Sequence, residues 1–376
     1  MARRVAAVVA TERVGRRCLL WLFAACCPLP ASAGEKAATS VLVYADTDHV
    51  TVWKPLASAA AEFGQTTLRT TLTTDFISAA SVDLVSAASP RGYTERRNEA
   101  QLGGGYDFGD GTRLDVDGAA SREPDFRSQS VSASGSVDWR GRRITTVGSL
   151  GLATAATGRA GDDTAWRDRS SRDANLQASI ILTQETVLDA IYSLQQLHGY
   201  QASLYRYVRL FRGDSPQHET AVTENVPDQR YRHAATVRMR QRWRPDLFGM
   251  CDYRWYADTW GMVAHTASVR ATWTLPYAAW TVTAEARGHR QSGATFYQGH
   301  YATLPEAPLY RTADKELGPL WTLLGGLHLE WSRMLTRTTT LRVDAGADVL
   351  HLRYLDHPYL QSRTALLTTV GIVVEK

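Results

Sequence analysis

Charged side chains recur at every second position in the C-terminal half of the chain. Arg238, Arg240 and Arg242 alternate in this way, and the segments that follow carry carboxylates and further arginines at the same spacing. Residues two apart in a strand point to the same face. Such a face can brace a pore by cross-strand ion pairs, or it can select the ions that pass along it.

We expect this charged face to line the lumen of a β-barrel. Because the two signs are interleaved, mutual neutralisation is the favoured interpretation. A charged constriction, in which the arginine row attracts anions, is the alternative. The lumen and selectivity candidates are Arg238, Arg240, Arg242, Arg254, Asp252, Asp258, Arg270, Glu285, Arg287, Asp344 and Asp348.

The strands that would carry these residues are visible as alternation of apolar and polar positions. Val131, Ala133, Gly135, Val137 and Trp139 form one line, and four serines with an aspartate form the other. The pattern recurs through most of the chain and runs longer than the usual strand of a soluble sandwich. We therefore predict an all-β fold, an antiparallel transmembrane barrel whose apolar line faces lipid.

The connections between these segments are of two kinds. Tight turns are expected near 108–112, 140–143, 183–186, 244–247, 276–279 and 335–338. Longer connections are expected near 77–95, 121–129, 158–171, 199–229, 259–265, 291–318 and 353–364. Short periplasmic turns and long extracellular loops are typical of outer-membrane barrels, and the count is about 14 to 16 strands. Residues 39–62 are either an N-terminal strand pair or a lumen segment, and 199–229 and 291–318 are the longest loops.

The N-terminus has the features of a secretory signal peptide over residues 1–33. Five arginines precede an apolar run, and Ala31-Ser32-Ala33 forms the cleavage site. Residues 34–376 then form one barrel domain. The signal, with five arginines against Glu12, accounts for the formal charge of +4, so the mature chain is close to neutral and nucleic acid is not an expected partner. We expect export to the outer membrane of a Gram-negative bacterium.

Two loops hold further candidates for binding. The stretch 75–90 brings hydroxyls and carboxylates together, and either a loop packed on the wall or a weakly indicated cation site would use them. The basic, aromatic loop 199–229 could form a constriction, a lid, or a contact with lipopolysaccharide or a partner protein. The loop candidates are Asp75, Ser78, Asp83, Tyr205, Arg206, Tyr207 and Arg209.

Several motifs resemble a bacterial family named domain of unknown function 3570. They are YADTDHVTV (44–52), DFISAASVDLVSAASP (75–90), Glu123-Pro124-Asp125-Phe126, YRYVRLF (205–211) and YADTWG (256–261). The resemblance spans nearly the whole mature chain and implies an outer-membrane β-barrel. It brings no activity, substrate or catalytic residue. The C-terminus departs from outer-membrane barrels in general, because it lacks a terminal aromatic residue.

Three classes of function remain open at this point. A pore or transporter for an unidentified small solute is expected first, and a structural or partner-binding barrel with a closed, salt-bridged lumen is the alternative. An enzyme is expected least, because Asp258 with His265 is only a proximity in sequence and no GxSxG or HExxH motif is present. We expect no cofactor and no metal site; the expected partners are outer-membrane lipid, lipopolysaccharide and the solute.

Overall fold

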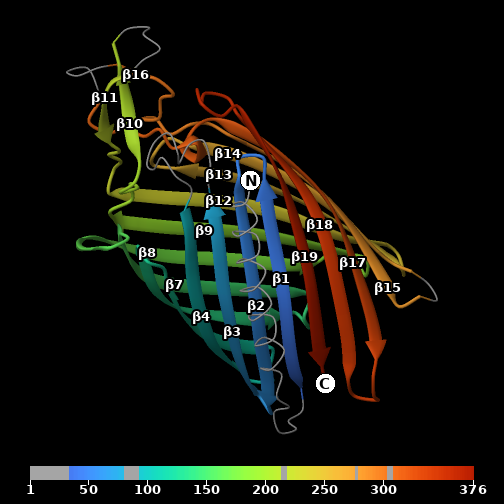
Figure 1. Cartoon of the computed structure of the whole chain (residues 1–376). Helices are drawn as coiled ribbons and strands as arrows, with labels where there is room; N and C mark the ends of the chain where they lie inside the picture. The colour runs from blue at the N-terminus through green and yellow to red at the C-terminus, as the bar shows by residue number, and fades with distance from the viewer. Residues whose placement is uncertain (1–33, 80–92, 213–217, 276–277, 303–307) are drawn as a thin grey trace, which may run out of the picture.

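The computed structural model describes residues 34–79, 93–212, 218–275, 278–302 and 308–376. Its main body is a closed antiparallel barrel of sixteen strands, in which the first strand of the chain pairs with the last (Figure 1). The predicted fold class and strand number are confirmed. The predicted signal peptide, residues 1–33, lies outside the described residues, as does Asp83.

The barrel strands follow one another around the wall almost in chain order. They are β1 (Glu35–Asp46), β2 (Val50–Phe63), β3 (Thr66–Ala79), β4 (Tyr93–Asp107), β5 (Thr112–Arg122), β6 (Phe126–Trp139), β7 (Ile144–Arg159), β8 (Asp162–Ile181), β9 (Thr186–Gly199), β12 (Gln229–Arg244), β13 (Leu247–Asp258), β14 (Val263–Thr274), β15 (Trp280–Gln291), β17 (Leu320–Met334), β18 (Thr340–Tyr354) and β19 (Ser362–Glu375). Residues 39–62 thus belong to the wall, as the strand pair β1–β2, and not to a lumen segment.

The outer face of this wall is apolar over its middle. Leu102 is 70% exposed, Leu150 69% and Val269 57%, and all three point away from the lumen. Such side chains are buried in a water-soluble domain, so their exposure indicates contact with lipid. Cys251 is exposed on this face too. No helix within the described ranges is long and apolar enough to cross a bilayer.

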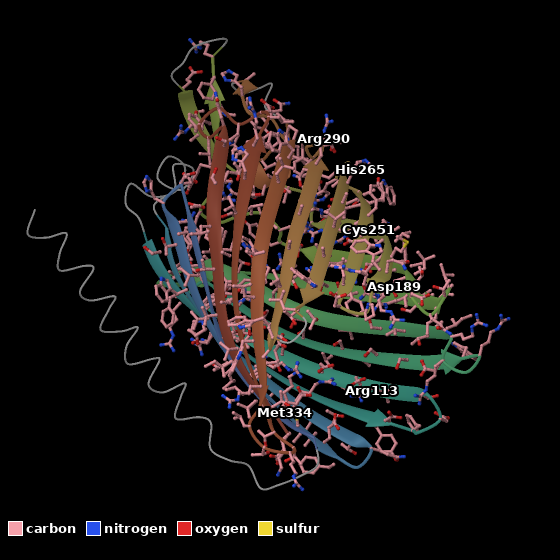
Figure 2. All side chains as sticks on the ribbon, turned by 90° about the vertical axis from the view of Figure 1, so that its right-hand side faces the viewer. Arg113, Asp189, Cys251, His265, Arg290 and Met334 are labelled. Atoms are coloured by element: carbon pink, nitrogen blue, oxygen red, sulfur yellow. The ribbon has the colours of Figure 1, made fainter. Side chains whose placement is uncertain are left out.

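The two ends of the barrel differ. Met334 marks the end with the tight turns, and Arg290 lies near the opposite end (Figure 2). Exposed tryptophans lie toward both ends of the wall. Trp139, Trp243, Trp273 and Trp280 lie near the tight turns, and Trp53 and Trp255 lie nearer the opposite end. Those near the tight turns form the aromatic girdle expected at a membrane interface.

Two connections at the other end are shorter than expected. β5 and β6 are joined by residues 123–125, and β7 and β8 by residues 160–161, where longer loops were predicted near 121–129 and 158–171. The strands continue there with polar residues on both faces, because a strand that projects above the membrane has no lipid-facing side. In these two segments the sequence has polar residues at successive positions, which resembles a loop, although the chain remains a strand.

The two longest loops fold into structure of their own. β10 (Tyr207–Phe211), β11 (His218–Thr223) and β16 (Tyr301–Ala302) form a small sheet above one rim, accompanied by the 3-10 helix η1 (Lys315–Leu317) (Figure 1). Val208 and Leu210 are fully buried there against Tyr301. We call these segments, with the apolar cluster around Trp260, the cap.

Candidate functional site

The register of the strands arranges the charged candidates in rows across the inner wall. One row runs from Asp189 on β9 to Arg238 on β12 and Asp252 on β13. It continues through Ser268 on β14 to Arg287 on β15. Neighbours in such a row have Cβ atoms about 5 Å apart, so the residues that alternation placed on one face also lie side by side.

Two of the predicted arginines are neutralised by carboxylates. Arg240 Nη2 lies 2.8 Å from Asp189 Oδ1, and the Asp189 side chain is only 2% exposed. Arg270 Nη2 lies 2.5 Å from Glu285 Oε2, and its Nε donates to the same oxygen at 3.0 Å. These pairs join β9 to β12 and β14 to β15. Such cross-strand ion pairs brace the wall of the barrel.

Two other predicted arginines have no such partner. Arg254 on β13 and Arg287 on β15 both point into the lumen and are exposed to it. Their neighbours across β14 are Thr266 and Ser268, which are uncharged. Among the residues that the structure describes, neither arginine forms an ion pair or a side-chain hydrogen bond. Their positive charge is therefore presented to whatever fills the lumen.

Arg238 and Asp252 are neither joined in an ion pair nor without neighbours of opposite charge. Arg238 lies between Asp189 and Asp252 in the register, yet its buried Nε has no hydrogen-bond partner. Asp252 instead accepts a short hydrogen bond from Ser268. The row thus has an arginine whose hydrogen-bonding capacity is incompletely used.

Asp258 is closed off from solute. Its side chain is fully buried, 2.5 Å from Arg230, and it accepts a hydrogen bond from Tyr256 Oη at 2.6 Å. Arg230 stacks over Trp260 at 4.0 Å. His265 points to the outer face and contacts Tyr253 at 2.6 Å, so Asp258 and His265 do not form a catalytic pair.

The remaining lumen candidates lie in the middle of the wall or toward the tight-turn end. Arg242 Nη2 is 3.6 Å from Glu185, and Asp348 Oδ1 is 3.0 Å from His328 Nε2. The Asp344 carboxylate lies against Gly371 on β19, where an added Cβ would meet Oδ1 at 2.5 Å. Interactions across neighbouring strands therefore hold this part of the wall too.

A strong ion-pair network on the opposite wall was missed by the sequence analysis. Arg69 on β3 reaches Asp115 at 2.7 Å and Asp117 at 3.1 Å, across β4. Arg113 adds a second guanidinium 2.8 Å from Asp115. The sequence contained part of the information needed to predict this network, because Gly103 and Gly105 on β4 leave the room that these side chains fill.

A hollow of about 410 Å³ lies on the lumen face between β4 and β12. Arg169 and Arg232 line it, together with Arg97 and Glu99. Arg232 Nη1 donates to Gln195 at 3.0 Å, whereas its buried Nε has no partner. None of these arginines was predicted as a lumen candidate, and Arg169 falls in the loop that was expected near 158–171.

The loop candidates of 199–229 anchor the cap to the barrel. Arg206 Nη1 lies 2.5 Å from Asp314, Tyr205 Oη accepts from the backbone of Ala160 at 2.8 Å, and Tyr207 Oη accepts from Arg159 at 3.1 Å. Arg209 stacks over Tyr359 at 4.6 Å. These side chains have structural partners within the described residues.

Asp75 and Ser78 both fall in β3. The Asp75 side chain is buried and lies 3.6 Å from Lys54 Nζ. Three other carboxylates, those of Glu95, Glu123 and Asp125, each offer an oxygen within 4.8 Å of the others and could hold a hard cation. Burial raises the pKa of Glu123, and Arg97 at 3.5 Å opposes that shift.

Several solved structures share the barrel fold at a distance. The siderophore receptor PirA from Pseudomonas aeruginosa is 9% identical, over 92% of this chain and 81% of that chain, with a TM-score of 0.43. CdiB from Acinetobacter baumannii is 8% identical, over 90% and 60%, with a TM-score of 0.49. A FadL homologue from Pseudomonas aeruginosa is 9% identical, over 91% and 89%, with a TM-score of 0.41. Likenesses this distant transfer no ligand or activity.

The sequence itself connects the chain to relatives more directly. Among curated proteins a sequence comparison finds no match. The model of the family described as "Protein of unknown function (DUF3570)" matches residues 156–347, which is half of the chain and includes β8 to β17 entirely. The resemblance noted in the motifs is thereby confirmed, and the chain belongs to the DUF3570 family.

Proposed function

We propose that the protein is an outer-membrane pore that passes small anionic solutes. The closed barrel, its apolar outer face and its tryptophan girdle support placement in the outer membrane. The predicted signal peptide would direct export. A barrel that crosses the outer membrane offers its lumen as a path for solute, so the proposed function depends on this location.

The observation that carries the proposal is the pair of unpartnered arginines, Arg254 and Arg287. A positive charge in a water-filled lumen with low-dielectric walls concentrates anions and repels cations. Arg240 and Arg270 add little to this field, because Asp189 and Glu285 neutralise them. We therefore assign the anion preference first to Arg254 and Arg287, which are exposed to the lumen and lie outside the ion-pair network.

A structural barrel with a closed lumen is the second candidate. The network of Arg69, Arg113 and Asp115 favours it, since braced side chains of this kind fill lumen space. The two candidates differ in one measurable property. A pore conducts ions, and a closed barrel does not.

Single-channel recording in planar bilayers under a salt gradient tests the proposal. We expect the native protein to conduct with anion preference, and Arg254→Glu/Arg287→Glu to reverse that preference. Arg290→Glu is the matched control, because Arg290 lies on the same strand as Arg287, is exposed, and points to the outer face. It should leave the reversal potential unchanged.

Two results would contradict the proposal of an anion-selective pore. One is absence of conductance at any voltage from protein that is folded and inserted. The other is a reversal potential that the double variant shares with the native protein. The first result favours the closed barrel, and the second removes the arginines from selectivity.

A further inference from the structure

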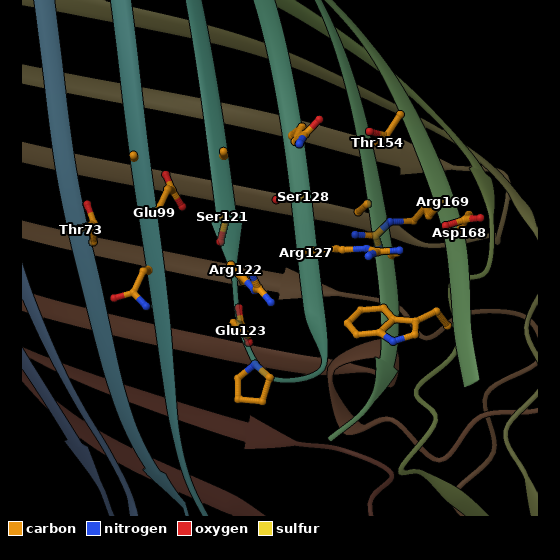
Figure 3. Close-up of a pocket in the computed structure, with 18 of the residues that line it drawn as sticks. Thr73, Glu99, Ser121, Arg122, Glu123, Arg127, Ser128, Thr154, Asp168 and Arg169 are labelled. Carbon is orange, nitrogen blue, oxygen red and sulfur yellow. The ribbon is translucent and has the colours of Figure 1, made fainter. Parts of the chain in front are cut away.

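An arginine-rich groove lies on the outer face of the wall, away from the lumen. It is an open hollow of about 1440 Å³ over the upper ends of β3 to β8. Arg122 and Arg127 occupy neighbouring strands in it, and Asp168 lies two strands beyond Arg127 (Figure 3). By strand alternation these three side chains, and Arg96 with them, point outward, since Ser121 and Ser128 on the same strands point to the lumen.

The arginines of this groove lie unusually close for groups of like charge. Arg122 and Arg127 are directly opposite one another in the β5–β6 register, and Asn98 is the neighbour of Arg122 on the other side. Like charges in opposed positions destabilise a sheet. Within the described part of the chain, neither arginine forms an ion pair. Of the carboxylates that line the groove, Glu99 and Glu123 pair with Arg97, and Asp168 pairs with neither Arg122 nor Arg127. A bound anion would offset this repulsion.

Aromatic rings hold two of the guanidinium groups in place. Arg127 stacks over Trp166 at 4.7 Å, and Arg96 lies over Phe76 at 5.6 Å. Trp166 in turn packs on Gly158, where an added Cβ would meet the ring at 2.8 Å. Arg96 Nε donates to Asn98 Oδ1 at 3.1 Å. Stacking uses the faces of a guanidinium and leaves its other N–H groups available, which is the geometry that recognises phosphate.

The groove lies at the height of lipid head groups. Arg127 is four residues above Val131, which is 50% exposed on the lipid-facing line. Four residues span about 13 Å along a strand, and a strand tilt of about 40° makes this roughly 10 Å in height. Leu102 and Leu72, both exposed, continue the apolar surface below the arginines. A ligand here would meet guanidinium groups above and apolar side chains below.

We propose that this groove binds the phosphate of a phosphorylated glycolipid of the outer leaflet, the lipid A part of lipopolysaccharide. Arg96, Arg122 and Arg127 hold the phosphate, and the acyl chains lie on the apolar wall around Leu102. The proposal shares with the proposed function only the placement of the barrel in the outer membrane. It does not depend on conduction through the lumen.

The test measures lipid A retained by the purified full-length barrel. Native protein and Arg96→Gln/Arg122→Gln/Arg127→Gln are incubated in detergent with bisphosphorylated lipid A, and the bound lipid is quantified by mass spectrometry. We expect roughly tenfold weaker binding by the variant, because charge-assisted contacts to phosphate are lost. Dephosphorylated lipid A should bind to the native protein no better than lipid A binds to the variant.

A matched control removes three arginines at the opposite end. Arg140, Arg333 and Arg337 are exposed at or beside the tight turns, so their replacement by Gln changes the net charge equally. This control should bind lipid A as the native protein does. Millimolar inorganic phosphate should not displace the lipid, whereas displacement would identify a free-phosphate site and overturn the proposal. Equal retention by both triple variants, or preference for phospholipid vesicles over lipid A, would overturn it as well.

Folding and conduction are recorded on the same preparations. Heat-modifiable migration on gels shows whether each variant is a folded barrel, and Arg122→Gln alone provides a milder variant if the triple one does not fold. Lost lipid binding with unchanged conductance supports the groove, and unchanged lipid binding with absent conductance contradicts only the pore.

Discussion

The barrel wall and the cap differ in which side chains they bury. In the wall, large apolar side chains such as Leu102 and Leu327 are more than half exposed, and the buried positions include the charged Asp189. In the cap, Leu210 and Val208 are fully buried, as in a water-soluble domain. One chain thus contains a region whose burial pattern suits lipid and a region whose burial pattern suits water.

This difference shows what stabilises each region. The wall is held by continuous cross-strand pairing, closed around sixteen strands, because backbone groups in lipid must be satisfied internally. The cap has a short sheet and depends on apolar packing and on ion pairs such as Arg206 with Asp314. Changes that are costly in one region should therefore be mild in the other.

The largest effect is expected where the two regions meet. Arg230 and Asp258 form a buried ion pair at the top of β12 and β13, and Trp260 of the cap covers it. Asp258→Ala leaves Arg230 buried without a counter-charge and should lower the free energy of unfolding by about 3 to 5 kcal/mol. Urea unfolding in lipid vesicles, followed by tryptophan fluorescence, measures this loss. Arg230→Met/Asp258→Ala should recover most of it, and a double variant as unstable as the single one would refute the account.

A smaller difference in stability is expected between alanine substitutions at two leucines, one in the cap and one on the lipid face. Leu210→Ala opens a cavity in the cap and should cost about 2 to 5 kcal/mol. Leu327→Ala on the lipid face should cost only the transfer term, roughly 2 kcal/mol, since fluid acyl chains fill the space. Limited proteolysis should also show a cap that is cut faster in Leu210→Ala alone. An equal rate of cutting in both variants would mean that the cap is not an independently packed unit.

The smallest effect is a pH dependence confined to the cap. Burial raises the pKa of Glu224, although Arg206 opposes the shift. A carboxyl group with a raised pKa in the folded state binds its proton more tightly there than in the unfolded state. The cap should therefore gain stability as the pH falls through the raised pKa toward the ordinary value. Hydrogen exchange of residues 218–226 at pH 8 and pH 5 should show the gain, and Glu224→Gln should flatten it. A cap that opens more at pH 5 would contradict this sign.

Much of the barrel can be predicted from the sequence, because a strand that crosses a membrane alternates between lipid-facing and lumen-facing side chains. Its alternation predicts which side chains face lipid and which face the lumen, and the inward positions of Arg254 and Arg287 were obtained in this way. The tight turns near 108–112 and 140–143 were also predicted from local residue types and are present. These features depend only on neighbours along the chain.

The partners of those residues could not be predicted. Alternation shows that Arg240 faces inward, but the register between β9 and β12 decides that Asp189 neutralises it. Residues 200–228, which include β10 and β11, separate those strands, so the offset between the strands has no local signal. The groove at Arg122 and Arg127 was missed for another reason: above the membrane both faces of a strand are polar, and the rule of alternation no longer applies.

The seam between β1 and β19 also bears on how the molecule is made. Lys36 pairs with Glu375, so the contact that closes the ring joins segments more than three hundred residues apart. Such a contact carries the largest loop-closure entropy in the chain and is the slowest kind to form. Until it forms, the growing sheet has two bare edges, each a template for pairing with another chain. Assembly of this barrel therefore has a single committing event, and the same event removes both of its aggregation-prone edges.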